Sequence, residues 1–281
     1  MVSEGGFDAN YYVVLKSDPL FYNCHEYTII KSLSNDGSYS GTALDGMKIL
    51  NLACGPATEI PHFLEKGASL VVGLDVDANM VNNAKYYLSS IGSDSSKYSI
   101  YKADCFSIDS ISQALPLDIY SDYFDAVADF WLICNASSIT QLESGFKATN
   151  KFLKIGGIYS FVTVNPKEIQ EFSKFQELMS VDWYTNLKRL FYDGEIAKIE
   201  YAFMDMKTRQ EKFVFNATVW TLDDVKNALE RCGFELVGAK GYETNPNFDF
   251  SNKSQQSREL MTGEYTPGFC FKARKIANAE N

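Results

Sequence analysis

The segment Met47–Ala57, MKILNLACGPA, constrains the fold of this chain more than any other stretch. A short apolar run leads into the small residues at 53–55, and a helical pattern begins at Pro56. About twenty residues later a second apolar run, LVVGLDVD, carries the acid Asp75 near its end. This order predicts a parallel strand that leads into a tight turn, and a second strand whose terminal carboxylate can bind ribose hydroxyls.

The glycine content of the turn argues against a dinucleotide. The dinucleotide fingerprint G-x-G-x-x-G needs three glycines, and here Asn51, Ala53 and Ala57 leave only Gly55. We therefore expect a nucleoside ligand without a pyrophosphate, and S-adenosylmethionine is the obvious candidate. A nicotinamide-dependent oxidoreductase is an alternative with the same kind of sheet, but this chain lacks the glycine fingerprint of that class.

The elements around this turn alternate between strands and helices. Such alternation predicts an α/β fold, a Rossmann-like, doubly wound parallel sheet. The expected strands are 47–53, 69–75, 98–102, 123–131 and 157–164, and the expected helices are 56–66, 77–90, 108–115 and 138–153.

After Val164 the alternation stops. We expect one or two helices within 166–191, the second of them DWYTNLKRLF, and then an antiparallel pair of strands. The chain resumes with a helix that has Thr221 as its N-cap and Gly233 just past its end. The expected strands of this part are 195–206, 210–219, 234–240 and 268–274.

Composition limits the partners and the location. The net charge is −10 and no Lys/Arg cluster is visible, so nucleic acid is not an expected partner. The six cysteines are scattered without a C-x-x-C pair, and the chain has two histidines, so we expect neither a metal site nor a disulfide framework. No apolar run is long enough for a membrane span, and the N-terminal residues do not resemble a signal peptide. A cytoplasmic protein without a membrane partner is expected.

Several segments, taken in their order and spacing, resemble the class I S-adenosylmethionine-dependent methyltransferases over nearly the whole chain. More narrowly, the chain looks like the toxoflavin-synthase-like branch of small-molecule methyltransferases. The segments are ILNLACGPATE, VVGLDVDANMVNNAK, YKADCF, FDAVADFWLICNASSITQLESGFKATNKFLKIGGIYSFVTVNP and TLDDVKNALERCGFE.

The resemblance implies a domain plan. It implies a seven-stranded sheet of order 3-2-1-4-5-7-6 in which strand 7 is antiparallel. It also implies an N-terminal helical lid and an α+β insert after strand 5. The parts are a lid at 1–46, a cofactor-binding core at 47–164, a substrate-side insert at 165–219, and completion of the core sheet by 220–281.

The first motif of this family is usually acid-x-Gly-x-Gly-x-Gly, with its backbone under the methionyl part of the cofactor. The corresponding residues here are Asn51, Ala53, Cys54, Gly55 and Ala57. Asn51 lacks the usual negative charge, so its hydrogen bond to the loop or to the cofactor ammonium would be weaker. An ordinary strand-to-helix turn is the alternative.

The resemblance also assigns the adenosine side of the site. Asp75 would accept both ribose hydroxyls, Val76 and Met80 would flank the adenine, and Asp104 would accept from the adenine amino group. Cys105 would offer its backbone amide. A solvated acid at a strand end is the alternative for Asp75, and a loop-capping aspartate is the alternative for Asp104.

Aromatic residues are implied on the methyl-accepting side. Phe130 would contact the cofactor and Trp131 the substrate, although burial in the core is an equal alternative for both. In the lid, Tyr12 would touch the methionyl group and Tyr22 would face the substrate, with lid packing as the alternative. Trp183 of the insert would cover the substrate, and dimer contact competes for that surface, so a monomer or a homodimer is expected.

Methyl transfer from a sulfonium is an in-line displacement that depends mainly on alignment and exclusion of water. A general base helps only if the nucleophile must lose a proton, and His25 is at most an auxiliary base. The sequence thus predicts methylation of a small, aromatic or heteroaromatic metabolite, on nitrogen rather than oxygen. A non-catalytic cofactor-binding protein that regulates a partner enzyme is the alternative, because Asn51 departs from the motif.

Overall fold

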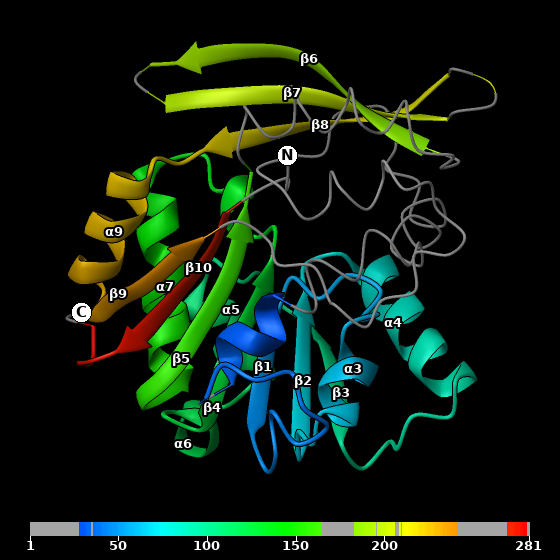
Figure 1. The fold of residues 1–281 in the computed structure, drawn as a ribbon, viewed down its shortest axis with the longest axis vertical. Coiled ribbons are helices and arrows are strands. Elements are labelled where there is room, and N and C mark those ends of the chain that lie inside the picture. Colours follow the sequence, from blue (N-terminus) through cyan, green and yellow to red (C-terminus); the bar gives the residue numbers. More distant parts are fainter. Residues whose placement is uncertain are drawn as a thin grey trace.

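The computed structural model contains a large central sheet and a smaller sheet that lies beyond the carboxyl ends of its parallel strands (Figure 1). The structure describes residues 28–34, 36–164, 183–194, 196–205, 208, 210–240 and 269–279.

The central sheet has seven strands in the order β3-β2-β1-β4-β5-β10-β9. Neighbouring strands are parallel from β3 to β5, and β10 is antiparallel to both β5 and β9. This confirms the order that the resemblance implies, with the antiparallel last strand of the chain between strands five and six. The strands are β1 Lys48–Leu52, β2 Leu70–Asp75, β3 Tyr98–Lys102, β4 Phe124–Phe130, β5 Leu153–Thr163, β9 Phe234–Lys240 and β10 Phe269–Lys275.

Helices cover both faces of the central sheet. Residues 28–33 are helical and pack with α3 and α4 on one face, while α5, α7 and α9 pack on the other. The helices are α3 Ile60–Glu65, α4 Ala78–Ser90, α5 Ile108–Ala114, α6 Leu117–Tyr120, α7 Ile139–Phe152 and α9 Leu222–Arg231, with a short 3₁₀ helix η1 at Ile133–Asn135.

Strand β1 shows why this segment forms the middle of the sheet. Ile49 packs in one apolar layer, whereas Leu50 and Leu52 pack in the opposite layer, so both faces of the strand are buried. On β2, a Cβ placed at Gly73 would lie 2.8 Å from Ile100 Cδ1 and 2.9 Å from Cys54 Sγ. Glycine at this position therefore allows the turn after β1 to pack directly against the sheet.

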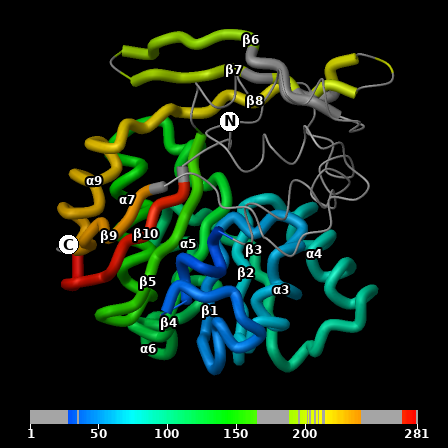
Figure 2. The backbone as a smooth tube through the Cα atoms, viewed as in Figure 1, coloured from blue at the N-terminus to red at the C-terminus, as the bar shows by residue number. Residues whose placement is uncertain are grey.

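The smaller sheet is antiparallel, with the order β6-β7-β8. Its strands are β6 Trp183–Asp193, β7 Ile196–Asp205 and β8 Glu211–Val219. Figure 2 shows that β8 continues directly into α9, so the chain returns from the smaller sheet to the core without a long connection. The predicted antiparallel pair is thus confirmed as β7 and β8.

Two sequence predictions of local structure are wrong. The segment DWYTNLKRLF was predicted as a helix, but Trp183–Asp193 is strand β6, because its pairing with β7 satisfies the backbone and overrides helical periodicity. The helix after the first turn was predicted from Pro56, but α3 begins at Ile60. Ala57 has φ +59°, which no right-handed helix accommodates, so residues 56–59 remain a turn.

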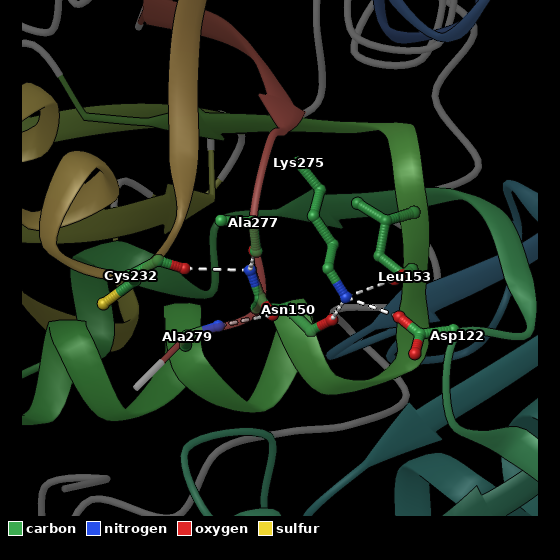
Figure 3. A network of polar contacts seen from close by, with 7 residues as sticks. All are labelled: Asp122, Asn150, Leu153, Cys232, Lys275, Ala277 and Ala279. Atoms are coloured by element: carbon green, nitrogen blue, oxygen red, sulfur yellow. Dashed lines mark hydrogen bonds and ion pairs between the residues drawn. The ribbon is translucent and has the colours of Figure 1, made fainter. Parts of the chain in front are cut away.

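The amino end of the sheet is closed by a polar network that we call the Lys275 clamp (Figure 3). Lys275 is fully buried, and its Nζ donates to Asp122 Oδ1 at 2.6 Å and to the carbonyl oxygens of Asn150 at 2.7 Å and Leu153 at 2.8 Å. The Asn150 amide donates to the Cys232 and Ala277 carbonyls and accepts from the Ala279 backbone. These contacts fasten the last residues of the described chain to α7 and to the end of α9.

None of the described helices has the length and apolarity that crossing a membrane requires.

Candidate functional site at the carboxyl ends of the strands

The turn after β1 adopts a conformation that the sequence did not make evident. Ala53, Gly55 and Ala57 have φ of +47°, +52° and +59°. These are the three positions at which the methyltransferase motif usually has glycine, and the left-handed region costs an alanine on the order of 1 kcal/mol. The backbone path of the motif is therefore present, and two alanines adopt it at the expense of local strain.

Asp75, at the end of β2, links this turn to the next strand. Its side chain is buried, Oδ2 accepts from Gly55 N at 2.8 Å, and Oδ1 accepts from Asp77 N at 2.9 Å. A carboxylate offers about four acceptor positions, so one such group can accept several donors at once. The acid and the turn that the sequence predicted to act together do lie together.

Cys54, the second residue of the turn, fixes the turn against β2. Cys54 N donates to Leu74 O at 2.9 Å, which extends the pairing of β1 and β2 into the turn. Burial raises the pKa of the Cys54 thiol, and the nearby charges of Asp75 and Glu59 raise it further. This thiol therefore stays protonated at neutral pH and is unsuited to act as a nucleophile.

Asn51, on β1, is a buried polar side chain that the described residues leave unsatisfied. It is fully buried, and neither its Oδ1 nor its Nδ2 has a hydrogen-bond partner. An unsatisfied buried amide costs about 1 to 3 kcal/mol, so its persistence next to a strained turn indicates a ligand group that completes its bonding.

The predicted adenine side is partly open. Val76 is 61% exposed, whereas Met80 on α4 is buried. Asp104 Oδ1 accepts from Phe106 N at 2.9 Å, so the loop-capping role is present, and its side chain is exposed. Cys105 is buried beside the Ala53 backbone, and burial raises the pKa of its thiol. These four residues follow β2 and β3 at the same edge of the sheet as Asp75.

The two aromatic residues at the end of β4 differ in their surroundings. Phe130 is buried and lies against Phe63, with ring centroids 6.4 Å apart. Trp131 is half-buried and has φ +73°, a conformation that a bulky side chain rarely adopts. Its ring packs against the core layer of α3 and α4 and also against an apolar cluster below the smaller sheet. Burial in the core thus describes Phe130 better than Trp131.

Sequence reasoning missed Asp129, which immediately precedes these aromatics on β4. Its carboxyl group is fully buried, Oδ1 accepts from Leu132 N at 2.7 Å, and Oδ2 accepts from Tyr159 Oη at 2.9 Å. Burial raises the pKa of Asp129 to about 7. The available signal was the second acid of FDAVADF, which follows the apolar residues 126–128 at the end of a strand expected to reach the site.

The smaller sheet contacts the core through the segment that follows β4. Thr218 on β8 donates to the Ala136 carbonyl at 2.5 Å, and Trp220 Nε1 donates to the Ile133 carbonyl at 2.8 Å. Cys134, Val164, Ile199 and Ala217 form the apolar cluster between them. Figure 1 shows β6, β7 and β8 beyond the carboxyl ends of the parallel strands, on the side where the turn after β1 lies.

Other predicted residues lie partly or wholly outside the described structure. Tyr12, Tyr22 and His25 fall outside the described residues, and Trp183 is described only as the first residue of β6. His62, the other histidine, is half-exposed on α3, with Nδ1 3.7 Å from Glu65 Oε2, and burial lowers its pKa. Among the described residues, no group of His, Cys, Asp and Glu side chains is arranged to hold a metal ion.

A sheet of this order, with its antiparallel strand and with the turn after β1 joined to an acid on β2, has the architecture of the class I S-adenosylmethionine-dependent methyltransferases. Solved structures share this fold. The crystal structure of a S-adenosylmethionine-dependent methyltransferase from Clostridium acetobutylicum matches 95% of this chain and 97% of its own, with a TM-score of 0.58 at 15% identity.

Two further structures carry more specific names. CalS10, an amino pentose methyltransferase from Micromonospora echinaspora that was solved with S-adenosylmethionine bound, matches 96% of this chain and 98% of its own, with a TM-score of 0.57 at 14% identity. The sugar N-methyltransferase KedS8 from Streptoalloteichus matches 97% of this chain and 94% of its own, with a TM-score of 0.55 at 16% identity. These similarities confirm the class I methyltransferase fold. The toxoflavin-synthase-like branch stays a prediction.

Comparison by sequence is less extensive. No protein-family model matches the chain. A curated, uncharacterized protein of Haemophilus influenzae is 30% identical over 92 residues, which are 32% of this chain and 33% of that protein. The match therefore spans about a third of the length of that relative.

Proposed function

We propose that this protein transfers a methyl group from S-adenosylmethionine to a small-molecule acceptor, on nitrogen rather than on oxygen. The observation that carries this proposal is the junction of Gly55 with Asp75, in a turn whose three motif positions all have positive φ. That backbone path turns the chain sharply at the end of β1, and the Asp75 carboxylate, an anionic acceptor of hydrogen bonds, lies next to it.

The described residues fit the nucleoside cofactor. Asp75 is an anionic acceptor of the kind that binds ribose hydroxyls, and the buried Asn51 amide has both a donor and an acceptor to offer to the methionyl group. Val76 offers an exposed apolar surface for the adenine, and Met80 on α4 is buried. The lack of negative charge at Asn51 predicts lower affinity than an acid there would give.

When bound, S-adenosylmethionine supplies an electrophilic methyl group. The protein has to align the acceptor with this methyl group and exclude water. The transfer itself needs no covalent intermediate with the protein. A nitrogen that carries a free lone pair needs no base before attack. His25 is then an auxiliary group, and turnover in His25→Ala should fall by less than about tenfold, roughly 1.4 kcal/mol in the barrier.

The acceptor is proposed from the surroundings of Trp131. Its ring lies between the core and the smaller sheet, where a flat or cyclic molecule could pack against it. The sequence favours an aromatic or heteroaromatic acceptor, and the names of the two similar sugar methyltransferases make an amino sugar the first alternative. Both classes offer a nitrogen acceptor, although the ammonium group of an amino sugar must first lose a proton, so both belong in the same acceptor panel.

Calorimetric titration with S-adenosylmethionine and with S-adenosylhomocysteine tests the cofactor assignment. Asp75→Ala should weaken both affinities by about ten- to hundredfold, because two charge-assisted hydrogen bonds to the ribose are lost. Asp118→Asn is the control, since Asp118 is an exposed acid on α6, at the opposite end of the sheet. Failure of the unmodified protein to bind either compound at millimolar concentration would contradict the proposal.

A cofactor-binding protein that regulates a partner enzyme is the second candidate, because Asn51 replaces the charged residue of the motif. This candidate predicts tight binding of S-adenosylhomocysteine without turnover of any compound in a broad panel of amines, amino sugars and heteroaromatics. Transfer of label from methyl-labelled S-adenosylmethionine to one panel member would exclude it.

We also propose that the protein acts in the cytoplasm. Cys54, Cys105, Cys134 and Cys232 carry free thiols, as is usual in a reducing compartment. The protein is predicted to be a monomer or a homodimer, and measurement of its molar mass in solution distinguishes the two.

A further inference from the structure

Asp129 is an unusual residue in the described part of the core. It is a carboxyl group with no exposed surface at the carboxyl end of β4, and it makes no ion pair with a described residue. Burial of such a group without a cation costs several kcal/mol unless hydrogen bonds offset it. Because burying Asp129 costs free energy, its carboxyl group is expected to contribute to the segment whose backbone N–H it accepts.

That segment is residues 131–136, which we call the β4 turn. Asp129 Oδ1 receives the Leu132 backbone N–H at 2.7 Å, immediately after the strained residue Trp131. The Trp131 carbonyl in turn accepts from Asn135 Nδ2 at 2.7 Å and from Cys134 Sγ at 3.0 Å. Hydrogen bonds on both sides of Trp131 therefore hold its left-handed conformation.

The β4 turn is also where the smaller sheet attaches. The Thr218 and Trp220 side chains of the returning chain donate to the carbonyls of Ala136 and Ile133. Trp131 packs against the core layer that contains α3 and α4, and also against the apolar cluster of Cys134, Val164, Ile199 and Ala217. A change in the conformation of the β4 turn would consequently move Trp131 and the contacts of β8 together.

We propose that Asp129 is a positioning residue, whose buried carboxyl group locks the β4 turn and thereby fixes Trp131 between the central sheet and the smaller sheet. The assignment of Trp131 to the acceptor side rests on the proposed function. The locking of the turn does not, since it follows from hydrogen bonds and packing within this chain.

The groups that face Asp129 allow the lock to depend on pH. Tyr159 approaches from β5, the Cys134 thiol from η1 and the Cys105 thiol from the segment after β3, and the charge of Asp129 raises the pKa of all three. Leu52 of β1 and Phe161 of β5, its register partners, are apolar.

Because these neighbours stay protonated at neutral pH, Asp129 alone titrates there, near pH 7. The ionised carboxylate accepts the Leu132 N–H more strongly, but the cost of burying its charge outweighs that gain and raises its pKa. Ionisation therefore favours an opened turn in which the carboxylate meets water, and the β4 turn should be held most firmly below pH 7.

Tryptophan fluorescence of the full chain, free of ligand, tests the proposal. The emission of Trp131 is obtained by subtracting the spectrum of Trp131→Phe from that of the unmodified protein. Between pH 5 and 9 this difference should show one transition near pH 7, and Asp129→Asn, which keeps an acceptor for Leu132 N–H but cannot ionise, should abolish it. Asp125→Asn is the control, because Asp125 lies at the other end of the same strand.

A second variant separates locking from titration. Asp129→Leu removes the acceptor, so quenching of Trp131 by acrylamide should rise at least twofold, whereas Asp129→Asn should leave it near the unmodified value. A transition that persists in Asp129→Asn, or none in the unmodified protein, would overturn the proposal. If Asp129→Leu does not fold, the pH titration of Asp129→Asn still decides the matter.

The affinity for S-adenosylhomocysteine distinguishes failure of this proposal from failure of the proposed function. It should change by less than twofold in Asp129→Asn, because Asp129 pairs in register with Leu52, whereas Asn51 pairs with Ala128, and Leu52 and Ala128 lie in opposite core layers. Loss of binding in the unmodified protein would defeat the proposed function and leave the fluorescence result standing. A tenfold loss in Asp129→Asn alone would show that Asp129 supports the cofactor site and not the β4 turn.

Discussion

The two ends of the central sheet differ in how completely their polar groups are satisfied. At the amino end, the Lys275 ammonium makes three hydrogen bonds, and the Asn150 side chain bonds with both its oxygen and its nitrogen. At the carboxyl end, the Asn51 amide is buried without a partner among the described residues, and Ala53, Ala57 and Trp131 have positive φ.

This difference indicates where stability is gained and where function is placed. The Lys275 clamp joins β10 to α7 and to the end of α9, and it leaves no donor of the ammonium unused. Backbone strain and an unsatisfied buried amide lie instead at the carboxyl ends of the parallel strands, where binding sites of such sheets are usually found. Substitutions at the two ends should therefore have opposite consequences for folding and for binding.

The largest effect is expected at the clamp. Lys275→Met should lower the free energy of unfolding by about 4 kcal/mol, because two buried carbonyl oxygens and Asp122 lose their donor. Denaturant unfolding measures this, and Arg274→Met, an exposed residue on the same strand, is the control. A loss under 1 kcal/mol would show that the amino end does not provide the stability. Affinity for S-adenosylhomocysteine should stay unchanged in folded Lys275→Met.

Asp129 should make the stability of the carboxyl end depend on pH. Its folded pKa of about 7 lies above the ordinary 3.8, so the folded protein retains a proton that the unfolded chain has lost. Stability from this group is complete below about pH 4, falls as the pH rises to about 7 and stays low above it, a change on the order of 4 kcal/mol. Unfolding of Asp129→Asn, compared with the unmodified protein across pH 4 to 8, should lack this fall. Parallel pH profiles for the two proteins would contradict it.

At Asn51 the gain should be in binding. Asn51→Asp should tighten S-adenosylmethionine binding by about five- to tenfold, roughly 1 kcal/mol, because a carboxylate bonds the cofactor ammonium more strongly. The ligand-free protein should lose stability at the same time, since the new charge is buried. Calorimetry and thermal unfolding measure both, with Asn82→Asp on the exposed side of α4 as the control. Unchanged affinity would overturn this assignment.

The smallest effect concerns strain in the turn. Ala53→Gly should raise the free energy of unfolding by up to about 1 kcal/mol, because glycine adopts φ +47° without penalty. The same change at Ala84, within α4, should lower it by at least about 1 kcal/mol. If both variants lose stability equally in denaturant unfolding, the positive φ at Ala53 stores no strain.

Much of the architecture followed from local patterns. The strands around the first turn, the helix capped by Thr221 and the last strand all lie within a few residues of their predicted bounds. The failures have tertiary causes. Strand β6 forms because β7 lies beside it, and α3 starts late because Ala57 is held at positive φ by the packing of the turn.

The candidate site was predictable in part. The pairing of Gly55 with Asp75 followed from a motif, because residues at the ends of adjacent parallel strands meet. Asp129 did not, because the same acid in an exposed strand would be ordinary, and only its burial and its bond to Leu132 give it a role.

The sequence by itself determined the alternating order of strands and helices and the presence of a tight turn followed by an acid. Those features depend on spacing and residue type, which are local. The tertiary structure alone decided that two alanines take the backbone conformation of glycine, that Asn51 is buried unsatisfied, and that the β4 turn joins the two sheets. These features depend on contacts between residues far apart in the chain, and no local pattern encodes such contacts.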